Sequence, residues 1–282
     1  MQILLLHHPT KPEAKTAYQA CQEFLLKNKI PCRVLATDQT KSISRISHDC
    51  DIAIVVGGDG TILRAVHHLQ DLQTPVLGIN TGKLGFMTDV SLGQLHASLT
   101  DLILGKYRIQ KRLILKVTLQ DTTDPKPQVY HALNEIVIHR AQNPSLVSLK
   151  VSVDGSYLTS YSADGLIAAT PNGSTAYSLS AGGPIMAPDL ETLLLTPICP
   201  HTLSNRPIVL GSEKAVTVDV ESGGKTVDLT VDGFVFAKLS CQSSVKIEKA
   251  KRYFHWIALE RYDYFQTLRE KLLWNNATPY NT

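Results

Sequence analysis

The hydrophobic pattern of this 282-residue chain changes near residue 105, and this change constrains the fold more than any other feature. Up to that point, short apolar runs alternate with segments of helical spacing. The expected strands lie at 2–6, 32–36, 51–56 and 75–79, and the expected helices at 13–28 and 62–69. Such alternation is typical of a parallel sheet covered by helices, so an α/β domain is expected first.

Beyond residue 105, apolar residues alternate with other residues, which is the period of half-buried strands. The alternating positions are Leu113, Leu115, Val117 and Leu119, then Val216, Val218 and Val220, then Val227, Leu229 and Val231. Between the last two runs, Ser222-Gly223-Gly224 predicts a hairpin turn. These patterns indicate a second domain that is rich in strands.

The chain becomes helical again at its end, where Phe265, Leu268 and Leu272 recur at helical spacing. Such a stripe must cover something, and we expect it to pack back on the first domain. The predicted domains are therefore an α/β domain at 1–105 plus 258–282 and a β-rich domain at 106–257.

Charge and cysteine content exclude several classes of protein. The net charge is only +3, and no basic run of five or more residues indicates a nucleic-acid surface. The five cysteines form no Cys-x-x-Cys pair, which argues against a disulfide framework and a structural zinc site. No segment approaches the roughly 20 apolar residues of a membrane span, and the start does not resemble a signal peptide. We expect a cytoplasmic protein with reduced thiols, without nucleic-acid or membrane partners.

The first chemical motif is Gly57-Gly58-Asp59-Gly60-Thr61, which stands between a buried strand and a helix. Ligands bind at the carboxyl ends of strands in open α/β sheets, and the N–H groups that begin a helix attract anions. Glycines let a ligand approach the backbone, and Arg64 adds a positive charge for phosphate. The sequence therefore predicts a phosphate loop formed by Gly57, Gly58, Gly60 and Thr61.

Asp59 is the informative residue of this loop, because a carboxylate repels phosphate unless it holds a cation or meets a hydroxyl. It indicates either a base for an attacking hydroxyl or a contact to a phosphate-bound metal. The alternative is a tight turn in which Asp59 only caps the helix. The same five residues occur in lipid kinases of the diacylglycerol kinase type, and a related Gly-Gly-Asp-Gly occurs in 6-phosphofructokinases.

A second motif, Thr170–Pro184, is rich in hydroxyl groups and small side chains. Hydroxyls and backbone N–H groups bind phosphate or ribose, and Tyr177 offers a ring that stacks on a base. A Ser-rich loop with a core tyrosine is the alternative. Within the motif, 171–173 predicts a turn and Ser174 a helix cap.

Two shorter pairs also carry polar groups. Asn134-Glu135 lies inside the strand-like run 129–139 and offers donors and acceptors to an amide or a ribose diol. The alternative is a pair of turn or edge residues. Asp164-Gly165 is equally compatible with a simple turn.

Together these segments resemble the NAD kinases, which carry Gly57–Thr61, Asn134-Glu135, Ala163-Asp164-Gly165-Leu166 and Thr170–Pro184 in this order. The similarity extends over most of the chain and points to the bacterial ATP-dependent branch. It implies an N-terminal Rossmann-like α/β domain, a C-terminal β-sandwich-like domain and a terminal helix that returns to the first domain. It also implies ATP and NAD as substrates, a divalent cation that is usually Mg²⁺, and assembly as a homodimer or homotetramer.

The resemblance also assigns roles to residues. Asp59 matches the base that takes the proton from the adenosine-ribose 2′-hydroxyl of NAD, and Asp164 matches a carboxylate that reaches the nicotinamide end, often across a subunit contact. The positions expected at NAD are Asp59, Gly60, Arg64, Asn134, Glu135, Ser162, Asp164, Thr175, Ala176, Tyr177, Ser178, Leu179 and Ser180.

Three residues depart from the pattern of the family. Ser162 stands where many bacterial members carry Arg, a position linked with preference for NAD over NADH. Ser145 stands where a basic residue is common, and Phe234 follows Asp232-Gly233 where Gln is frequent. These departures concern the choice between NAD and NADH and the affinity for the product phosphate.

The leading hypothesis is a kinase that phosphorylates the adenosine-ribose 2′-hydroxyl of NAD with ATP, in NADP biosynthesis. One alternative is a lipid kinase of the diacylglycerol kinase type, which would act on a long-chain alcohol. The other is a dinucleotide-binding sensor without catalytic activity.

Overall fold

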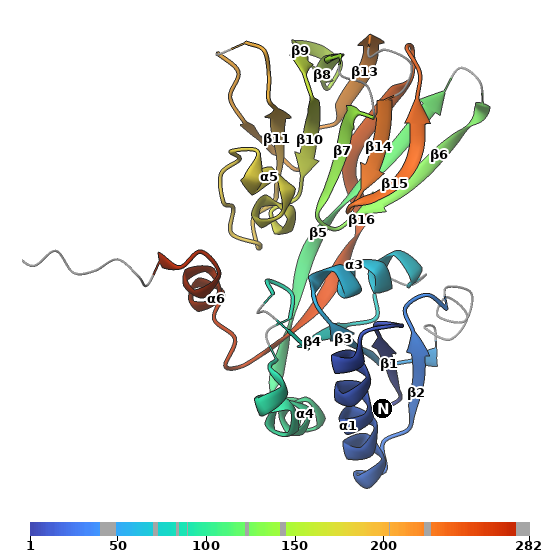
Figure 1. Cartoon of the computed structure of the whole chain (residues 1–282), viewed down its shortest axis with the longest axis vertical. Coiled ribbons are helices and arrows are strands. Elements are labelled where there is room, and N and C mark those ends of the chain that lie inside the picture. Colours follow the sequence, from blue (N-terminus) through green and yellow to red (C-terminus); the bar gives the residue numbers. More distant parts are fainter. Residues whose placement is uncertain are drawn as a thin grey trace, which may run out of the picture. The chain divides into compact units, whose positions relative to one another are not determined.

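The computed structural model describes residues 1–39, 49–69, 73–82, 85–88, 90–121, 124–141, 145–202, 204–222 and 227–274. The chain divides into two compact units (Figure 1). Unit 1 contains Met1–Lys111 and His255–Thr282, and unit 2 contains Arg112–Phe254.

Unit 1 is built on a parallel sheet whose strands follow the order β2-β1-β3-β4. These strands are β1 (Ile3–His7), β2 (Cys32–Ala36), β3 (Ile52–Gly57) and β4 (Val76–Asn80). Each lies within one or two residues of the strand predicted from sequence. All six residues of β3 are buried, which confirms that its continuous apolar run marks a central strand.

The described helices of unit 1 are α1 (Pro12–Lys27), α3 (Asp59–His68), the short 3₁₀ helix η2 (Leu92–Gln94), α4 (Leu95–Ile103) and α6 (Tyr264–Lys271). Of these, α1 and α4 pack apolar residues into the core of the sheet. In α1 the buried residues are Ala14, Ala17, Cys21 and Leu25, which recur once per turn and join the core of the sheet. Helix α3 begins three residues before its predicted start, because the extended residue Gly58 acts as its N-cap.

The terminal helix α6 is present in unit 1, but its packing differs from the prediction. Leu268 is buried, whereas the ring of Phe265 is 62% exposed and therefore does not belong to a buried stripe. The helix contacts the rest of unit 1 partly through charge, since the Lys271 Nζ atom lies 5.4 Å from the centroid of the Phe86 ring.

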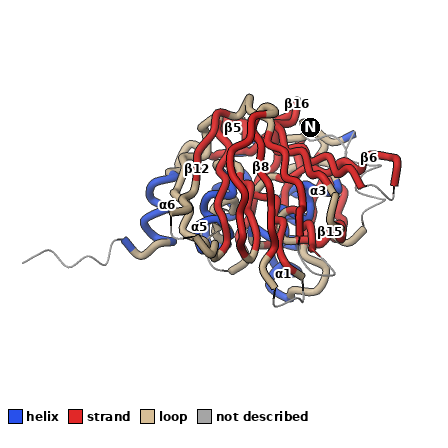
Figure 2. The backbone as a smooth tube through the Cα atoms, turned by 90° about the horizontal axis from the view of Figure 1, so that it is seen from above, coloured by secondary structure: helices blue, strands red, loops and turns tan. Residues whose placement is uncertain are grey.

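Unit 2 is a sandwich of two mostly antiparallel sheets. One contains β16 (Ser244–Leu259), β13 (Val216–Ser222), β8 (Val147–Val153) and β9 (Ser156–Ala163), with β5 (Tyr107–Asp121) and β6 (Asp124–Ala132) attached beside β16. The other follows the order β12 (Ile208–Gly211), β11 (Thr192–Ile198), β10 (Gly165–Ala169), β7 (Glu135–Arg140), β14 (Val227–Val231) and β15 (Phe234–Leu239). Figure 2 shows strands of this unit in red and the short helix α5 (Tyr177–Ser180) in blue.

A single apolar core joins the two sheets of unit 2. It takes the alternating residues predicted from sequence, among them Leu115 on β5, Val218 on β13 and Leu229 on β14. The predicted hairpin at 222–224 is wrong, because β13 and β14 belong to different sheets; residues 223–226 themselves lie outside the described residues. Apolar and polar residues alternate along both strands because the two strands face the same core from opposite sides.

The actual hairpin in this region joins β14 to β15 through Asp232-Gly233. Both residues have positive φ, 49° and 81°, as the tight turns of hairpins require. The predicted strand at 129–139 is also broken, since β6 ends at Ala132 and β7 begins at Glu135. Both differences matter for the site described below.

We expect Gly165→Ala to destabilise unit 2, because an added Cβ would lie 2.5 Å from the Ile138 carbonyl oxygen of the neighbouring strand. Overpacking of this kind costs about 1–3 kcal/mol. Gly211→Ala is the matched control, since a Cβ there meets nothing within 4 Å. Thermal unfolding of both variants measures the effect, and equal melting temperatures would contradict it.

Candidate active site

The Gly-rich turn of unit 1 lies at the carboxyl end of β3. Gly57 is required for packing, because a Cβ would come within 2.3 Å of the Thr61 Oγ1 atom. A Cβ at Gly58 or Gly60 would meet nothing within 4 Å. These two glycines therefore leave the start of α3 open to a ligand, as an anion-binding helix start requires.

The Asp59 side chain points away from the helix start and binds a distant segment of unit 1. Its Oδ2 atom accepts the N–H of Phe86 at 2.8 Å, and its Oδ1 atom accepts the N–H of Met87 at 3.0 Å. The Thr88 hydroxyl donates to Oδ1 at 3.4 Å. Because Gly58 is the N-cap and Asp59 lies in the first helical turn, the interpretation of Asp59 as a mere helix cap is wrong.

Positive charge gathers beside this turn. Arg64 is half-buried on α3, in its second turn, and its charge acts on His8, which follows β1. Burial lowers the pKa of His8, and the charges of Lys11 and Arg64 lower it further. The N–H of His8 also donates to the carbonyl of Val56 on β3, so these residues lie at the same edge of the sheet.

In unit 2, the break between β6 and β7 is built around one carboxylate. Asp232 accepts the backbone N–H groups of Leu133, Asn134 and Glu135 at 2.9, 2.7 and 3.0 Å. These bonds hold the chain where the strand was predicted to continue. Asn134 therefore lies in the turn between the two strands, and Glu135 is the first residue of β7.

The second motif packs directly on this break. The Thr170 N–H donates to the Asn134 carbonyl at 2.8 Å, and the Asn172 side chain donates to Asn134 Oδ1 at 2.7 Å. Gly173 is needed here, because a Cβ would lie 2.1 Å from the Asn134 carbonyl oxygen. The structure thus brings together two motifs that are more than 30 residues apart in the sequence.

Glu135 is the most perturbed acid of this site. Its side chain is almost completely buried, and its Oε2 atom has no hydrogen-bond partner among the residues that the structure describes. Burial and the nearby charge of Asp232 raise the pKa of Glu135 to about 8, against an N–H donated by Tyr177. An acid with one unsatisfied buried oxygen is a site that a ligand hydroxyl or amide can complete.

Some residues around α5 are buried and hold the loop in place, whereas others are exposed and accessible to a ligand. Ser178 is buried and its hydroxyl bonds to that of Thr196 at 2.8 Å. The Tyr177 ring is 46% exposed, so the interpretation as a core tyrosine is wrong. The half-buried or exposed positions are Thr175, Ala176, Leu179 and Ser180. Ser174 is not a helix cap, since Ala176 holds that place and Ser174 bonds instead to the N–H of Met186.

Asp164 and Ser162 do not join this group within the chain. Gly165, next to Asp164, pairs with His139, whereas Ala169 pairs with Glu135, so Asp164 lies at the opposite end of β10. Asp164 forms an ion pair with Arg140, whose Nε atom is 2.8 Å from Oδ1. Ser162 is exposed on β9, at the edge of its sheet.

Three structural roles were not predicted from the sequence: Asp232 holding the break between β6 and β7, Arg140 pairing with Asp164, and the segment 85–88 binding Asp59. Asp232-Gly233 carried a usable signal, because Asp-Gly between alternating apolar runs favours a tight hairpin. Arg140 and the segment 85–88 carried none, since their roles depend on contacts with residues far along the chain.

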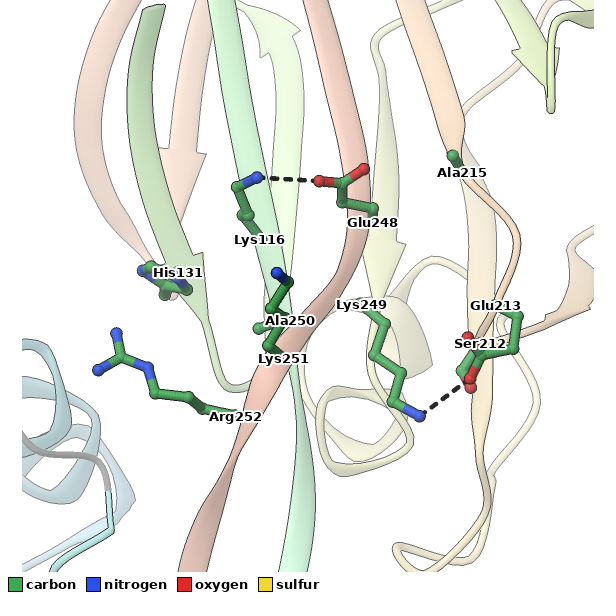
Figure 3. Close-up of a pocket in the computed structure, with 10 residues that line it drawn as sticks. All are labelled: Lys116, His131, Ser212, Glu213, Ala215, Glu248, Lys249, Ala250, Lys251 and Arg252. Carbon is green, nitrogen blue, oxygen red and sulfur yellow. Dashed lines mark hydrogen bonds and ion pairs between the residues drawn. The ribbon is translucent and has the colours of Figure 1, made fainter.

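A pocket of about 470 Å³ lies elsewhere in unit 2, between β5, β16 and the turn before β13 (Figure 3). Two of its cations are paired with acids: Lys116 with Glu248 at 2.9 Å, and Lys249 with Glu213 at 3.0 Å. Lys251 and Arg252 also line the pocket, so its lining carries more basic than acidic side chains. No predicted site residue lines it.

Neither a metal-binding cluster nor a membrane-spanning helix occurs in the described part of the chain. No group of three or more His, Cys, Asp or Glu residues there could hold a metal ion. Likewise, none of the helices described is both long and apolar enough to cross a membrane.

Comparisons with known proteins match both units. The ATP-NAD kinase N-terminal domain matches residues 3–107, and the ATP-NAD kinase C-terminal domain matches residues 133–259. The NAD kinase of Protochlamydia amoebophila is 45% identical over 270 residues, 93% of this chain and 94% of that protein. That of Geobacter metallireducens is 43% identical over 79% of each chain.

Solved structures agree with these matches. A yeast NADH kinase complexed with NADH covers the whole chain with a TM-score of 0.87 at 28% identity, over 90% of its own length. An Archaeoglobus fulgidus NAD kinase in complex with ATP has a TM-score of 0.77 at 26% identity, over 97% of this chain and 99% of its own.

Fold, motifs and matches define a phosphotransferase that acts on a nucleotide. The chain belongs to the NAD kinase family, whose reaction converts NAD to NADP with ATP. These matches favour NAD as the acceptor over the long-chain alcohol of a lipid kinase.

The raised pKa of Glu135 predicts how stability depends on pH. Between about pH 4.5 and 8 the folded chain holds a proton that the unfolded chain has released. Rising pH therefore favours unfolding across this window. Relative to Glu135→Gln, the wild-type melting temperature should fall as the pH rises from 5 to 9. A difference that stays constant with pH would contradict this assignment.

Proposed function

We propose that Asp59 is the base for transfer of the ATP γ-phosphoryl group to the adenosine-ribose 2′-hydroxyl of NAD. The proton of this hydroxyl moves to Asp59, its oxygen bonds to the γ-phosphorus, and the bond between that phosphorus and the β–γ bridging oxygen breaks to release ADP. The observation that carries the proposal is a half-buried carboxylate held at the carboxyl end of β3, beside glycines open to a ligand.

The donor phosphates are proposed to lie at the Gly-rich turn of unit 1. The start of α3 offers backbone N–H groups there, and Gly58 and Gly60 leave room for close approach. Lys11 and Arg64 supply positive charge at the same edge of the sheet. Phosphoryl transfer depends mainly on such positioning and charge neutralisation.

Mg²⁺ is proposed to arrive with ATP rather than to occupy a protein cage. No metal-binding cluster occurs among the described residues, and both oxygens of Asp59 face N–H or hydroxyl donors instead of a cation. Mg²⁺ commonly binds through substrate phosphates and retained water. When bound, it would neutralise charge on the transferred phosphoryl group.

NAD is proposed to bind unit 2 at the break between β6 and β7. The unsatisfied Oε2 atom of Glu135 accepts or donates a hydrogen bond to a ribose hydroxyl, beside the amide of Asn134. The exposed ring of Tyr177 stacks on a base, and the hydroxyl and backbone groups of 175–180 line the dinucleotide.

Asp164 and Ser162 are proposed to serve the nicotinamide end of NAD in a second copy of the chain. The place of Asp164 at the far end of β10 from Glu135, and of Ser162 on the edge strand β9, supports a contribution across a subunit contact, and thus a homodimer or homotetramer. Ser162 in place of Arg supplies no positive charge of its own at this end, whereas Arg140 forms an ion pair with Asp164 there. The five free cysteines support a reducing cytoplasm as the place of NADP biosynthesis.

We expect Asp59→Asn to lower kcat for NADP formation by about 10²- to 10⁴-fold, the range of general base catalysis, with little change in the KM for NAD. An amide nitrogen at this position would face the N–H of Phe86 or Met87, so Asp59→Ala is measured beside it. Circular dichroism and thermal unfolding check that both variants fold. Near-normal turnover of either one would remove Asp59 from the chemistry.

We expect Tyr177→Ala to raise the KM for NAD by about 5- to 100-fold, because base stacking contributes about 1–3 kcal/mol. Tyr177→Phe should keep near-normal binding. Tyr157→Ala is the matched control, since that ring is 63% exposed on β9.

Binding of NAD by calorimetry, with and without ATP, also separates an enzyme from a sensor, which would bind NAD without consuming ATP.

A further inference from the structure

The carboxylate of Asp59 is enclosed by the segment Gly85–Thr88, which lies 26–29 residues further along unit 1. Two consecutive backbone N–H groups, those of Phe86 and Met87, donate to its two oxygens at 2.8 and 3.0 Å. Because each oxygen accepts from a different backbone N–H group, both the position of the carboxylate and the orientation of its plane are restricted. Short hydrogen bonds of this kind to a carboxylate are stronger than those between neutral groups.

Gly85 makes this enclosure possible. A Cβ on Gly85 would lie 2.1 Å from Asp59 Oδ1, 2.7 Å from Asp59 Cγ and 2.4 Å from Thr88 Oγ1. The absence of a side chain here therefore makes room for the carboxylate of Asp59.

The segment is fixed to β4 at two points, so it holds Asp59 rigidly. The Met87 carbonyl packs on Gly78, where a Cβ would lie 2.1 Å from the carbonyl oxygen. Just after the segment, the Val90 carbonyl accepts the N–H of Asn80 at 2.8 Å. Thr88 is completely buried. Such anchoring is expected of a support whose task is to fix a side chain.

The hydrogen bonds also distinguish the two oxygens of Asp59. Oδ1 accepts from Met87 and from the Thr88 hydroxyl, whereas Oδ2 accepts only from Phe86 among the bonds of the described residues. A carboxylate oxygen has about two acceptor positions. Oδ2 therefore keeps one position for the hydroxyl proton of the substrate.

We propose that Gly85–Thr88 is a positioning element that aims Asp59 Oδ2 at the substrate hydroxyl, with Gly85 as its decisive residue. This inference rests on the proposed role of Asp59 as the base. Misplacement of a reacting group by about 1 Å costs roughly 10²-fold in rate. An added methyl group at Gly85 displaces the carboxylate without removing it.

The test is Gly85→Ala, with Gly93→Ala as the matched control. Gly93 lies on the exposed 3₁₀ helix η2, where a Cβ meets nothing within 4 Å. Gly85→Ala should lower kcat about 100-fold with the KM for NAD within about threefold, while Gly93→Ala stays within twofold of wild type. A folded Gly85→Ala enzyme with normal kcat would overturn the proposal.

A double-mutant cycle separates this inference from the role of Asp59 itself. If Gly85 acts through Asp59, Gly85→Ala should cause little further loss in the Asp59→Asn background. If Gly85→Ala lowers kcat by the same factor in the wild-type and Asp59→Asn backgrounds, its effect is a general structural one. That result would overturn the positioning role of Gly85–Thr88 but leave Asp59 as the proposed base. Normal activity of Asp59→Asn alone would instead refute the proposed base.

Thr88 provides a second route that does not depend on the Gly85 variant folding. Thr88→Val removes the hydroxyl that bonds to Oδ1 at nearly constant volume, and kcat should fall about three- to tenfold. Thr88→Ser should restore it. Equal kcat values for wild type, Thr88→Val and Thr88→Ser would contradict a positioning role for the segment.

Discussion

A carboxylate taken partly out of water needs hydrogen-bond donors, and in each unit of this chain an aspartate finds them on a backbone distant in sequence. In unit 1, Asp59 accepts N–H groups from Phe86 and Met87. In unit 2, Asp232 accepts three consecutive N–H groups that begin at Leu133. The first arrangement fixes the side chain that we propose as the base, whereas the second fixes the stretch of backbone that carries Asn134 and Glu135, which we propose to bind NAD.

The Asp232 interaction also determines the arrangement of the other residues of the proposed NAD site. The backbone held by Asp232 ends one strand, begins the next and presents Glu135 to the loop at 170–180. Close contacts at Gly173 and Thr170 then lock this loop onto Asn134. Glu135 is left buried beside a second acid with one oxygen unpaired. This arrangement is unfavourable for the free protein and favourable for a ligand that supplies the missing partner.

The sequence predicted those features that depend on neighbours along the chain. The buried run at 52–57, the alternating strands and the Gly-rich turn were all recognisable, because burial and close backbone approach impose their own residue types. It did not predict which residues hold Asp59, or that the strand ending at Ser222 and the strand beginning at Val227 belong to opposite sheets. Those outcomes depend on packing between distant segments. The exposed ring of Phe265 shows the same limit, since helical spacing alone does not reveal which side of a helix is covered.

Asp59 is the proposed centre of the reaction, and a structure of the chain with bound NAD tests this role most directly. The measurement is the distance between the Asp59 carboxylate and the 2′-oxygen of the adenosine ribose. If Asp59 is the base, the 2′-hydroxyl forms a direct hydrogen bond of about 2.6–3.2 Å to Oδ2, with the bonds from Phe86 and Met87 retained. A 2′-hydroxyl bound by another group, with Asp59 out of reach, would contradict it.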